Sequence, residues 1–227
     1  SSQKDFENSN FYMNISSYLN KKFKFNLALL SENYFDNKNY NKSKKVLNNF
    51  NKKDEIYYWY KIKKKTRILS EQKGKEDSYN YISLEFKKIN NPTAKILFDM
   101  ANISKSFKKY EVAIRYYDEV LSKINSNSNS YAEILFRRGS CYERLGKFEK
   151  SDNDLLKSLK INPDDAYVLN YLAYSWLERN YKIDEAIIML ENAYASKSND
   201  PYIIDSIGWA YYLVKDYIKA EKFLKRA

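Results

Sequence analysis

The chain has 227 residues, of which 44% are hydrophobic and 30% charged, and its formal net charge is +11. It contains no histidine, the commonest general base and metal ligand, and its four glycines match no phosphate-binding loop. We therefore predict that the protein is not an enzyme and holds neither a cofactor nor a metal. The low glycine and proline content is typical of a nearly all-helical chain. No apolar run is long enough to span a membrane.

Residues 1–93 carry helical patterns that are irregular in length and spacing. Residues 11–19 are interpreted as the second helix of an incomplete helix pair, and residues 24–57 as a complete pair. In residues 58–92, two helical patterns are interrupted near Gly74. We predict that these segments form an N-terminal helical region of degenerate repeats.

A regular pattern occupies residues 94–227. Its most regular unit is residues 132–165, which read as two short amphipathic helices. Gly146 suits the left-handed residue that ends the first helix, and Pro163 ends the second. The acids that follow, Asp164 and Asp165, can cap the next helix.

The same pattern recurs at residues 94–131, 166–200 and 201–227, and the last unit stops inside its second helix. One small residue recurs in successive units, 34 and then 35 residues apart: Gly139, Ala173 and Gly208. The polar residues 125–130 are expected to form a longer loop, and one extra residue is expected in the turn at 180–183.

Residues 132–165 resemble the tetratricopeptide repeat, a helix–turn–helix unit with the signature W-x2-L-G-x2-Y, then A-x3-F, then P. The matching positions are Leu135, Arg138, Gly139, Tyr142, Ser151, Leu155 and Pro163. Arg138 is the one clear departure, because the signature has leucine there. The resemblance implies an all-α fold, a right-handed superhelical solenoid of antiparallel helix pairs with about six repeats. We expect the sequence to be part of a longer chain.

The resemblance also implies where a ligand binds. In this family the first helix of each pair lines the concave face, and ligand contacts come from fixed positions of that helix. Those positions include Lys105, Ser106 and Ser140 here. The predicted binding residues are Phe98, Asn102, Phe136, Arg144, Tyr167, Asn170, Tyr174, Tyr202, Asp205, Trp209 and Tyr212. Many are aromatic, and Tyr and Trp are frequent anchors of protein interfaces.

We therefore expect a non-catalytic scaffold or adaptor that binds a segment of a partner protein in the concave groove. Chaperone-binding members of the family hold a chain-terminal carboxylate with a set of Lys, Arg and Asn. Only Asn102 fits that set here, which argues against a chaperone peptide and favours a segment with apolar side chains. Two alternatives stay open: a structural subunit that uses its convex face, and a protein that binds nucleic acid or anionic lipid.

The nucleic-acid or lipid alternative rests on residues 21–67, which hold fourteen Lys or Arg against four acids. Such a patch attracts phosphate backbones and anionic lipids. Its densest run supplies the predicted basic patch, Lys61, Lys63, Lys64, Lys65 and Arg67. The run also fits a solvated helix face whose inward side holds Trp59, Ile62, Thr66 and Leu69. Lysine is abundant throughout the chain, so this structural interpretation is favoured over nucleic-acid binding.

Two further features receive structural interpretations. Cys141 is the single cysteine and has no histidine near it, so we interpret it as a small buried apolar residue. The acids Asp152 and Asp154 are placed on the outer side of a second helix.

A narrower resemblance concerns residues 169–176, 184–186 and 200–211. They are similar to runs in bacterial envelope-type tetratricopeptide proteins, which are commonly exported or lipid-anchored. This similarity implies a bacterial adaptor, and it favours the periplasm or envelope over the cytoplasm.

Overall fold

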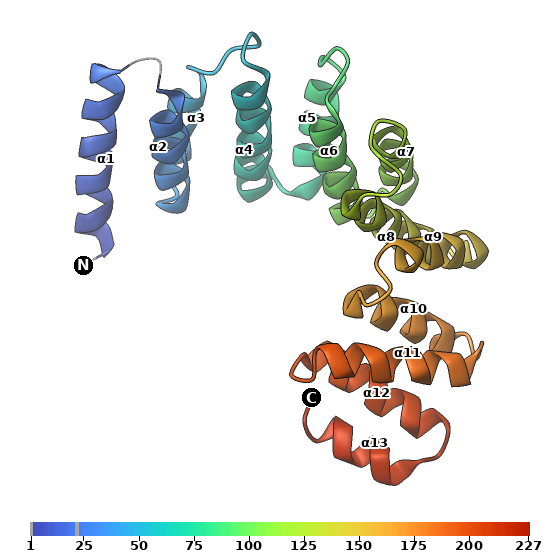
Figure 1. Ribbon diagram of the computed structural model, residues 1–227. Coiled ribbons are helices and arrows are strands. Elements are labelled where there is room, and N and C mark those ends of the chain that lie inside the picture. Colours follow the sequence, from blue (N-terminus) through green and yellow to red (C-terminus); the bar gives the residue numbers. More distant parts are fainter. Residues whose placement is uncertain (1, 21–22) are drawn as a thin grey trace. The chain divides into compact units, whose positions relative to one another are not determined.

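The computed structural model describes residues 2–20 and 23–227, and this part of the chain contains helices and no strand. The prediction of an all-α fold is therefore confirmed. The chain divides into two compact units, Ser1–Asn91 and Pro92–Ala227, whose helices are labelled in Figure 1. No helix among the described residues is long and apolar enough to cross a membrane.

The first unit contains helices of unequal length. Its helices are α1 (Ser2–Leu19), α2 (Lys24–Asp36), α3 (Tyr40–Leu47), α4 (Glu55–Lys73) and α5 (Lys75–Phe86). The shortest of them is α3. Between α4 and α5, Gly74 has a φ of 96°, in the left-handed region that favours glycine. The predicted break near Gly74 is thus confirmed, and both flanking segments are helical as expected.

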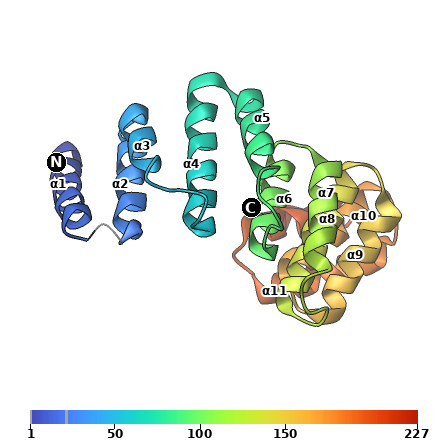
Figure 2. The ribbon, with the colours of Figure 1, turned by 90° about the horizontal axis from the view of Figure 1, so that it is seen from above.

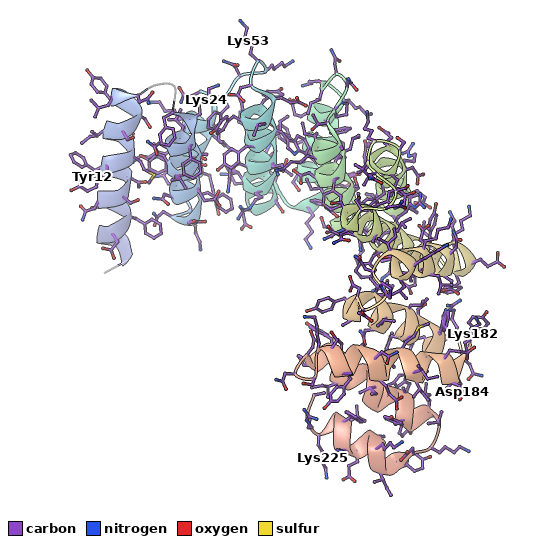
Figure 3. All side chains as sticks on the ribbon, in the orientation of Figure 1. Tyr12, Lys24, Lys53, Lys182, Asp184 and Lys225 are labelled. Atoms are coloured by element: carbon purple, nitrogen blue, oxygen red, sulfur yellow. The ribbon has the colours of Figure 1, made fainter. Side chains whose placement is uncertain are left out.

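Helix α1 is longer than the predicted segment 11–19, because its packing against α2 is partly polar. Its half-buried side carries Phe6, Asn10, Met13 and Ser17, at helical spacing. Asn33 on α2 donates a hydrogen bond to the Ser9 hydroxyl over 3.2 Å. An apolar pattern cannot reveal such a contact surface. The aromatic ring of Tyr12 lies on the opposite, exposed side of α1 (Figure 3).

The second unit consists of four consecutive helix pairs. Its helices are α6 (Ala94–Ser106), α7 (Tyr110–Leu121), α8 (Asn129–Arg144), α9 (Phe148–Ile161), α10 (Ala166–Glu178), α11 (Ile183–Ser196), α12 (Pro201–Leu213) and α13 (Tyr217–Leu224). Figure 2 shows α8 and α9 lying side by side. The polar loop predicted at 125–130 ends earlier than expected, at Ser128, because the Ser128 hydroxyl caps α8 by accepting from the Tyr131 amide.

Local chemistry accounts for the remaining helix ends. The Asp165 carboxylate accepts hydrogen bonds from the amides of Tyr167 and Val168, at 3.0 and 3.2 Å, and caps α10 as predicted. Gly146 ends α8 with a φ of 68°. In the turn before α11, the backbone of Asn180 and of Lys182 has a positive φ, in the left-handed region. Figure 3 labels Lys182 and Asp184 beside this turn.

The core of this unit lies between second helices and the first helices that follow them. Leu155 on α9 belongs to one buried cluster with Leu172 on α10 and Leu190 on α11. Within a pair, a small residue permits close approach of the two helices: a Cβ added at Gly208 on α12 would lie 2.8 Å from the Leu224 side chain on α13. Each pair therefore buries its apolar side against its neighbours.

Arg138, the departure from the repeat signature, is held by two carboxylates. Its guanidinium donates to both carboxylate oxygens of Asp154, each over 2.7 Å, and to Asp118 over 2.6 Å. Burial opposes the charged form, but Asp154 and Asp118 outweigh it and raise the pKa of Arg138. The predicted outer placement of Asp154 is wrong: its exposed fraction is only 1%, because it packs under Arg138.

This pairing yields a stability prediction. We expect Arg138→Leu to lower the free energy of unfolding by about 3–5 kcal/mol, because it leaves the buried Asp154 carboxylate unpaired. The double change Arg138→Leu with Asp154→Leu is expected to recover most of that loss, since an apolar pair can replace a buried ion pair. Urea denaturation followed by circular dichroism measures both. Arg115→Leu, on the exposed side of α7, is the control, and an equal loss in the single and double variants would contradict the prediction.

Candidate protein-binding face

The first helices of successive pairs in the second unit contact one another through side chains. Arg137 on α8 donates to the Asn102 side-chain oxygen on α6 over 3.3 Å. The Tyr171 hydroxyl on α10 donates to Glu143 on α8 over 2.9 Å. The Phe136 and Tyr171 rings meet edge to face, with centroids 5.5 Å apart. We call the surface formed by α6, α8, α10 and α12 the first-helix face.

A cleft of about 550 Å³ opens on this face between α6 and α8. Its lining residues are Asn102, Lys105, Ser106, Lys108, Tyr110, Arg137, Ser140, Arg144 and Tyr171. Four of these nine side chains are cationic and none is acidic, so we call it the cationic cleft. Its volume is within the range of sites that hold a ligand.

Two predicted residues lie beneath one wall of the cationic cleft. The Asn102 side-chain oxygen accepts from the Tyr117 hydroxyl over 2.7 Å as well as from Arg137. The Arg137 guanidinium lies 5.3 Å from the centre of the Phe98 ring and forms an ion pair with Glu133. Phe98 and Asn102 therefore position Arg137, which reaches the surface above them.

Lys105 occupies the floor of the cationic cleft, and its ammonium group donates to the Ser140 hydroxyl. Burial lowers the pKa of Lys105, and the charges of Arg137 and Arg144 lower it further. Together these effects outweigh the raising effects of Cys141 and Glu143.

The resemblance to the tetratricopeptide repeat implies ligand contacts at the positions of Lys105, Ser106 and Ser140, but these three were not among the predicted binding residues. The pairing of Lys105 with Ser140 spans two repeats, so no pattern within one repeat could have indicated it.

The aromatic residues of α10 and α12 form two groups rather than one. Trp209 and Tyr212 stack with centroids 5.5 Å apart, and Tyr212 also meets Tyr217 on α13. Tyr174 is 41% exposed, and its hydroxyl is hydrogen-bonded to Glu178 and lies in the field of Asp205. Burial, the Glu178 contact and the Asp205 charge all raise the pKa of Tyr174.

Tyr167 and Tyr202 stand apart from that group, in the first turns of α10 and α12. The Lys197 ammonium group lies 5.2 Å from the centre of the Tyr167 ring, whereas Tyr202 is 79% exposed. Asn170 and Trp209 are only partly exposed, and their buried side-chain polar atoms lack a hydrogen-bond partner among the described residues. Tyr202, Tyr167, Tyr212 and Tyr174 are the exposed aromatic residues among those predicted to bind a partner.

The predicted basic patch on α4 is mostly engaged within the first unit. Lys61 donates to the Phe50 carbonyl over 2.9 Å, and Lys65 donates to the Asn48 side chain over 3.1 Å. Both acceptors follow the end of α3, where cations offset the partial negative charge of a helix terminus. Lys63 also has an interaction partner.

The other two basic residues of the patch pair with one acid. Lys64 is 3% exposed and forms an ion pair with Glu32, and Arg67 reaches the same carboxylate over 3.1 Å. Both cations also lie over the Phe35 ring. These contacts favour a structural role for residues 61–67, but the predicted solvated face is wrong for Lys64, which is buried between α4 and its ion-pair partner on α2. Lys21 and Lys22, which belong to the wider basic region, lie outside the described residues.

Cys141 is buried on α8, and burial raises the pKa of its thiol to about 11. A thiol with so high a pKa carries almost no thiolate at neutral pH and is a poor nucleophile. Among the described residues, no cluster of His, Cys, Asp and Glu could hold a metal ion.

Comparisons with known proteins agree with this architecture. Residues 132–165 match the family model described as tetratricopeptide repeat. A TPR repeat-containing protein of Pseudomonas aeruginosa is 30% identical over 94 residues, which are 41% of this chain and 16% of that protein. A second such protein, from Methanocaldococcus jannaschii, is 34% identical over 80 residues, 35% of this chain and 13% of its own length. The chain thus matches only a small part of these relatives.

Among solved structures, the fold is similar to the APC/C hetero-tetramer Cut9–Hcn1. The TM-score is 0.61 at 15% identity, and the match covers 91% of this chain and 40% of that one.

The ion pairs of Glu32 give a pH-dependent prediction. Burial alone would raise the pKa of Glu32, but hydrogen bonding with Lys64 and the charges of Lys64 and Arg67 hold it below the ordinary value of 4.5. The stabilisation is thus present above pH 4.5 and is lost as the pH falls through the lowered pKa. We expect Glu32→Gln to lower the free energy of unfolding by about 1–3 kcal/mol at neutral pH, because Lys64 is then buried unpaired.

The difference between Glu32→Gln and the unaltered protein is expected to shrink on acidification, which urea denaturation at a series of pH values measures. Glu71→Gln, on the exposed side of α4, is the matched control and should change little at any pH. A loss for Glu32→Gln that stays constant down to strongly acidic pH would show that the ion pairs do not carry the stabilisation.

Proposed function

We propose that this chain, a tetratricopeptide-repeat protein, is a non-catalytic scaffold that binds a segment of a partner protein on its first-helix face. Tetratricopeptide repeats generally mediate contacts between proteins. The observation that carries the proposal is that exposed aromatic side chains and a polar cleft lie on the same face of four consecutive first helices. Tyr174 and Tyr212 are exposed there, whereas the core residues of the same helices are buried.

The chemistry of this face fits a protein ligand. Tyrosine and tryptophan bury a large area on binding, lose few rotamers and offer a polar tip, so they dominate the energetics of many interfaces. The Trp209 ring stacks on the Tyr212 ring and restricts its motion in the free protein. A preorganised ring loses less conformational entropy on binding.

The structure gives less support to the two alternatives, binding of nucleic acid or anionic lipid and a structural subunit that uses its second helices. The cations at residues 61–67 are engaged inside the first unit, so a phosphate backbone would have to displace their present partners. The surface formed by the second helices does expose apolar side chains, such as Ile188 on α11. Ile188 is therefore the control position in the crosslinking experiment on the first-helix face.

Site-specific photo-crosslinking tests the proposal. A benzophenone amino acid placed at Tyr174 is expected to capture a discrete protein from the native cell, and the same group at Ile188 is expected to capture none. Both positions are well exposed, at 41% and 56%, so reactivity of the probe itself does not decide the outcome. Capture at Ile188 alone would refute the proposal and favour a structural subunit that uses its second helices.

Once a partner is captured, its affinity can be measured directly. We expect Tyr174→Ala to weaken binding about tenfold to thirtyfold, the usual loss at an aromatic anchor. Tyr181→Ala removes a ring of similar exposure in the turn before α11 and is expected to leave the affinity unchanged. Isothermal titration calorimetry measures both, with circular dichroism as a check of folding.

A further inference from the structure

The positive charges of the cationic cleft are compensated unequally. Arg137 has an ion pair with Glu133 at 2.7 Å, and Arg144 lies 3.5 Å from Glu143. Lys105 has only a neutral partner, the Ser140 hydroxyl. Neither Lys105 nor Lys108 forms an ion pair in the part of the chain that the structure describes.

The environment of Lys105 in the free protein disfavours its positive charge. Its ammonium group is partly buried near two guanidinium groups. Burial and these charges disfavour its protonated form and outweigh the opposite effects of Cys141 and Glu143.

Arg138 and Lys64 each have a carboxylate partner. Lys61 and Lys65, in contrast, donate to neutral oxygens at the end of α3, where the helix terminus is partly negative. A cation kept without a counter-charge is the pattern expected where a ligand brings the opposite charge.

The size and lining of the cleft limit that ligand. A volume of about 550 Å³ far exceeds the space of a single carboxylate group, and four cations surround it. The hydroxyl groups of Ser106 and Ser140 add neutral hydrogen-bonding groups. Several anionic groups borne on one chain match this arrangement better than one terminal carboxylate does.

The neighbouring surface distinguishes a protein from a nucleic acid. Glu178 and Asp205 are exposed beside Tyr174 on the same first-helix face. A nucleic acid carries a phosphate at every residue, so its backbone would be repelled as it continued from the cationic cleft toward α10 and α12. A polypeptide can carry acids in one stretch and apolar or basic side chains in the next.

We propose that the cationic cleft binds the side-chain carboxylates of an acidic segment of the partner, with Lys105 as the central contact and Lys108, Arg137 and Arg144 around it. This inference rests on the proposed function, because the segment belongs to the protein held on the first-helix face. It adds the chemical class of that segment and the helices, α6 and α8, on which its acidic part lies.

A short oligoglutamate peptide with an amidated C-terminus and a fluorescent label tests the inference by anisotropy at low salt. We expect saturable binding that Lys105→Met weakens at least about tenfold, because a partly desolvated charge pair is lost. Lys105→Arg, which keeps the charge, is expected to restore most of the affinity. Lys123→Met removes the same charge from an exposed site in the loop before α8 and should leave binding nearly unchanged.

The stability of the Lys105→Met protein is a second readout. Because this change removes an uncompensated cation, we expect the urea midpoint to stay the same or rise. Substitution of a purely structural lysine would lower the midpoint, and weakened binding by such a destabilised variant would count against the inference. The inference is supported if the Lys105→Met protein is as stable as the unaltered protein and has lost its affinity for the peptide.

Three other outcomes would overturn the inference. They are equal loss of binding in Lys105→Met and Lys123→Met, tighter binding of a single-stranded oligonucleotide at the same cleft, and equal binding of a neutral peptide with a free C-terminal carboxylate. Crosslinking at Tyr174 without oligoglutamate binding would leave the proposed function standing while this inference fails. Lys105-dependent peptide binding without any crosslink at Tyr174 would count against the proposed function instead.

Discussion

Within Pro92–Ala227, a second helix buries its apolar side both on its own first helix and on the first helix of the next pair. Leu155 of α9 packs in one cluster with Val168 and Leu172 of α10, and Leu190 of α11 joins Ile207 of α12. A first helix is therefore covered on two sides by second helices, and its remaining side is free to vary without cost to the core. The packing fixes where a binding surface lies, and the residues on that free side decide its chemistry.

Three cations in the helix interfaces show how structural and functional charges can be told apart. Arg138 and Lys64 replace apolar contacts, and each is matched by a carboxylate on a neighbouring helix. Such pairs contribute little net stability, but losing one partner is costly, so both partners are constrained together. Lys105 is less buried than Lys64, and its hydrogen-bond partner is a neutral hydroxyl group rather than a carboxylate.

Features set by local chemistry could be predicted from the sequence. The break at Gly74 and the cap at Asp165 depend on residues within a few positions, and both were predicted correctly. The start of α1 could not be predicted, because Asn10 and other polar residues form its contact side. The burial of Asp154 and the pairing of Lys105 depend on residues 16 and 35 positions away. Periodicity within one repeat carries no information on such contacts.

Arg138 also bears on whether these repeats could exchange places. Its guanidinium joins Asp154 in its own pair to Asp118 in the preceding pair. If residues 132–165 were duplicated in tandem, the arginine of the second copy would meet Leu156, which occupies in α9 the place that Asp118 has in α7. The following first helices have Leu172 and Ile207 at the position of Arg138. Gene duplication or recombination that changed the order of the repeats would therefore remove the Asp118 contact of this guanidinium and leave Asp154 as its one carboxylate partner.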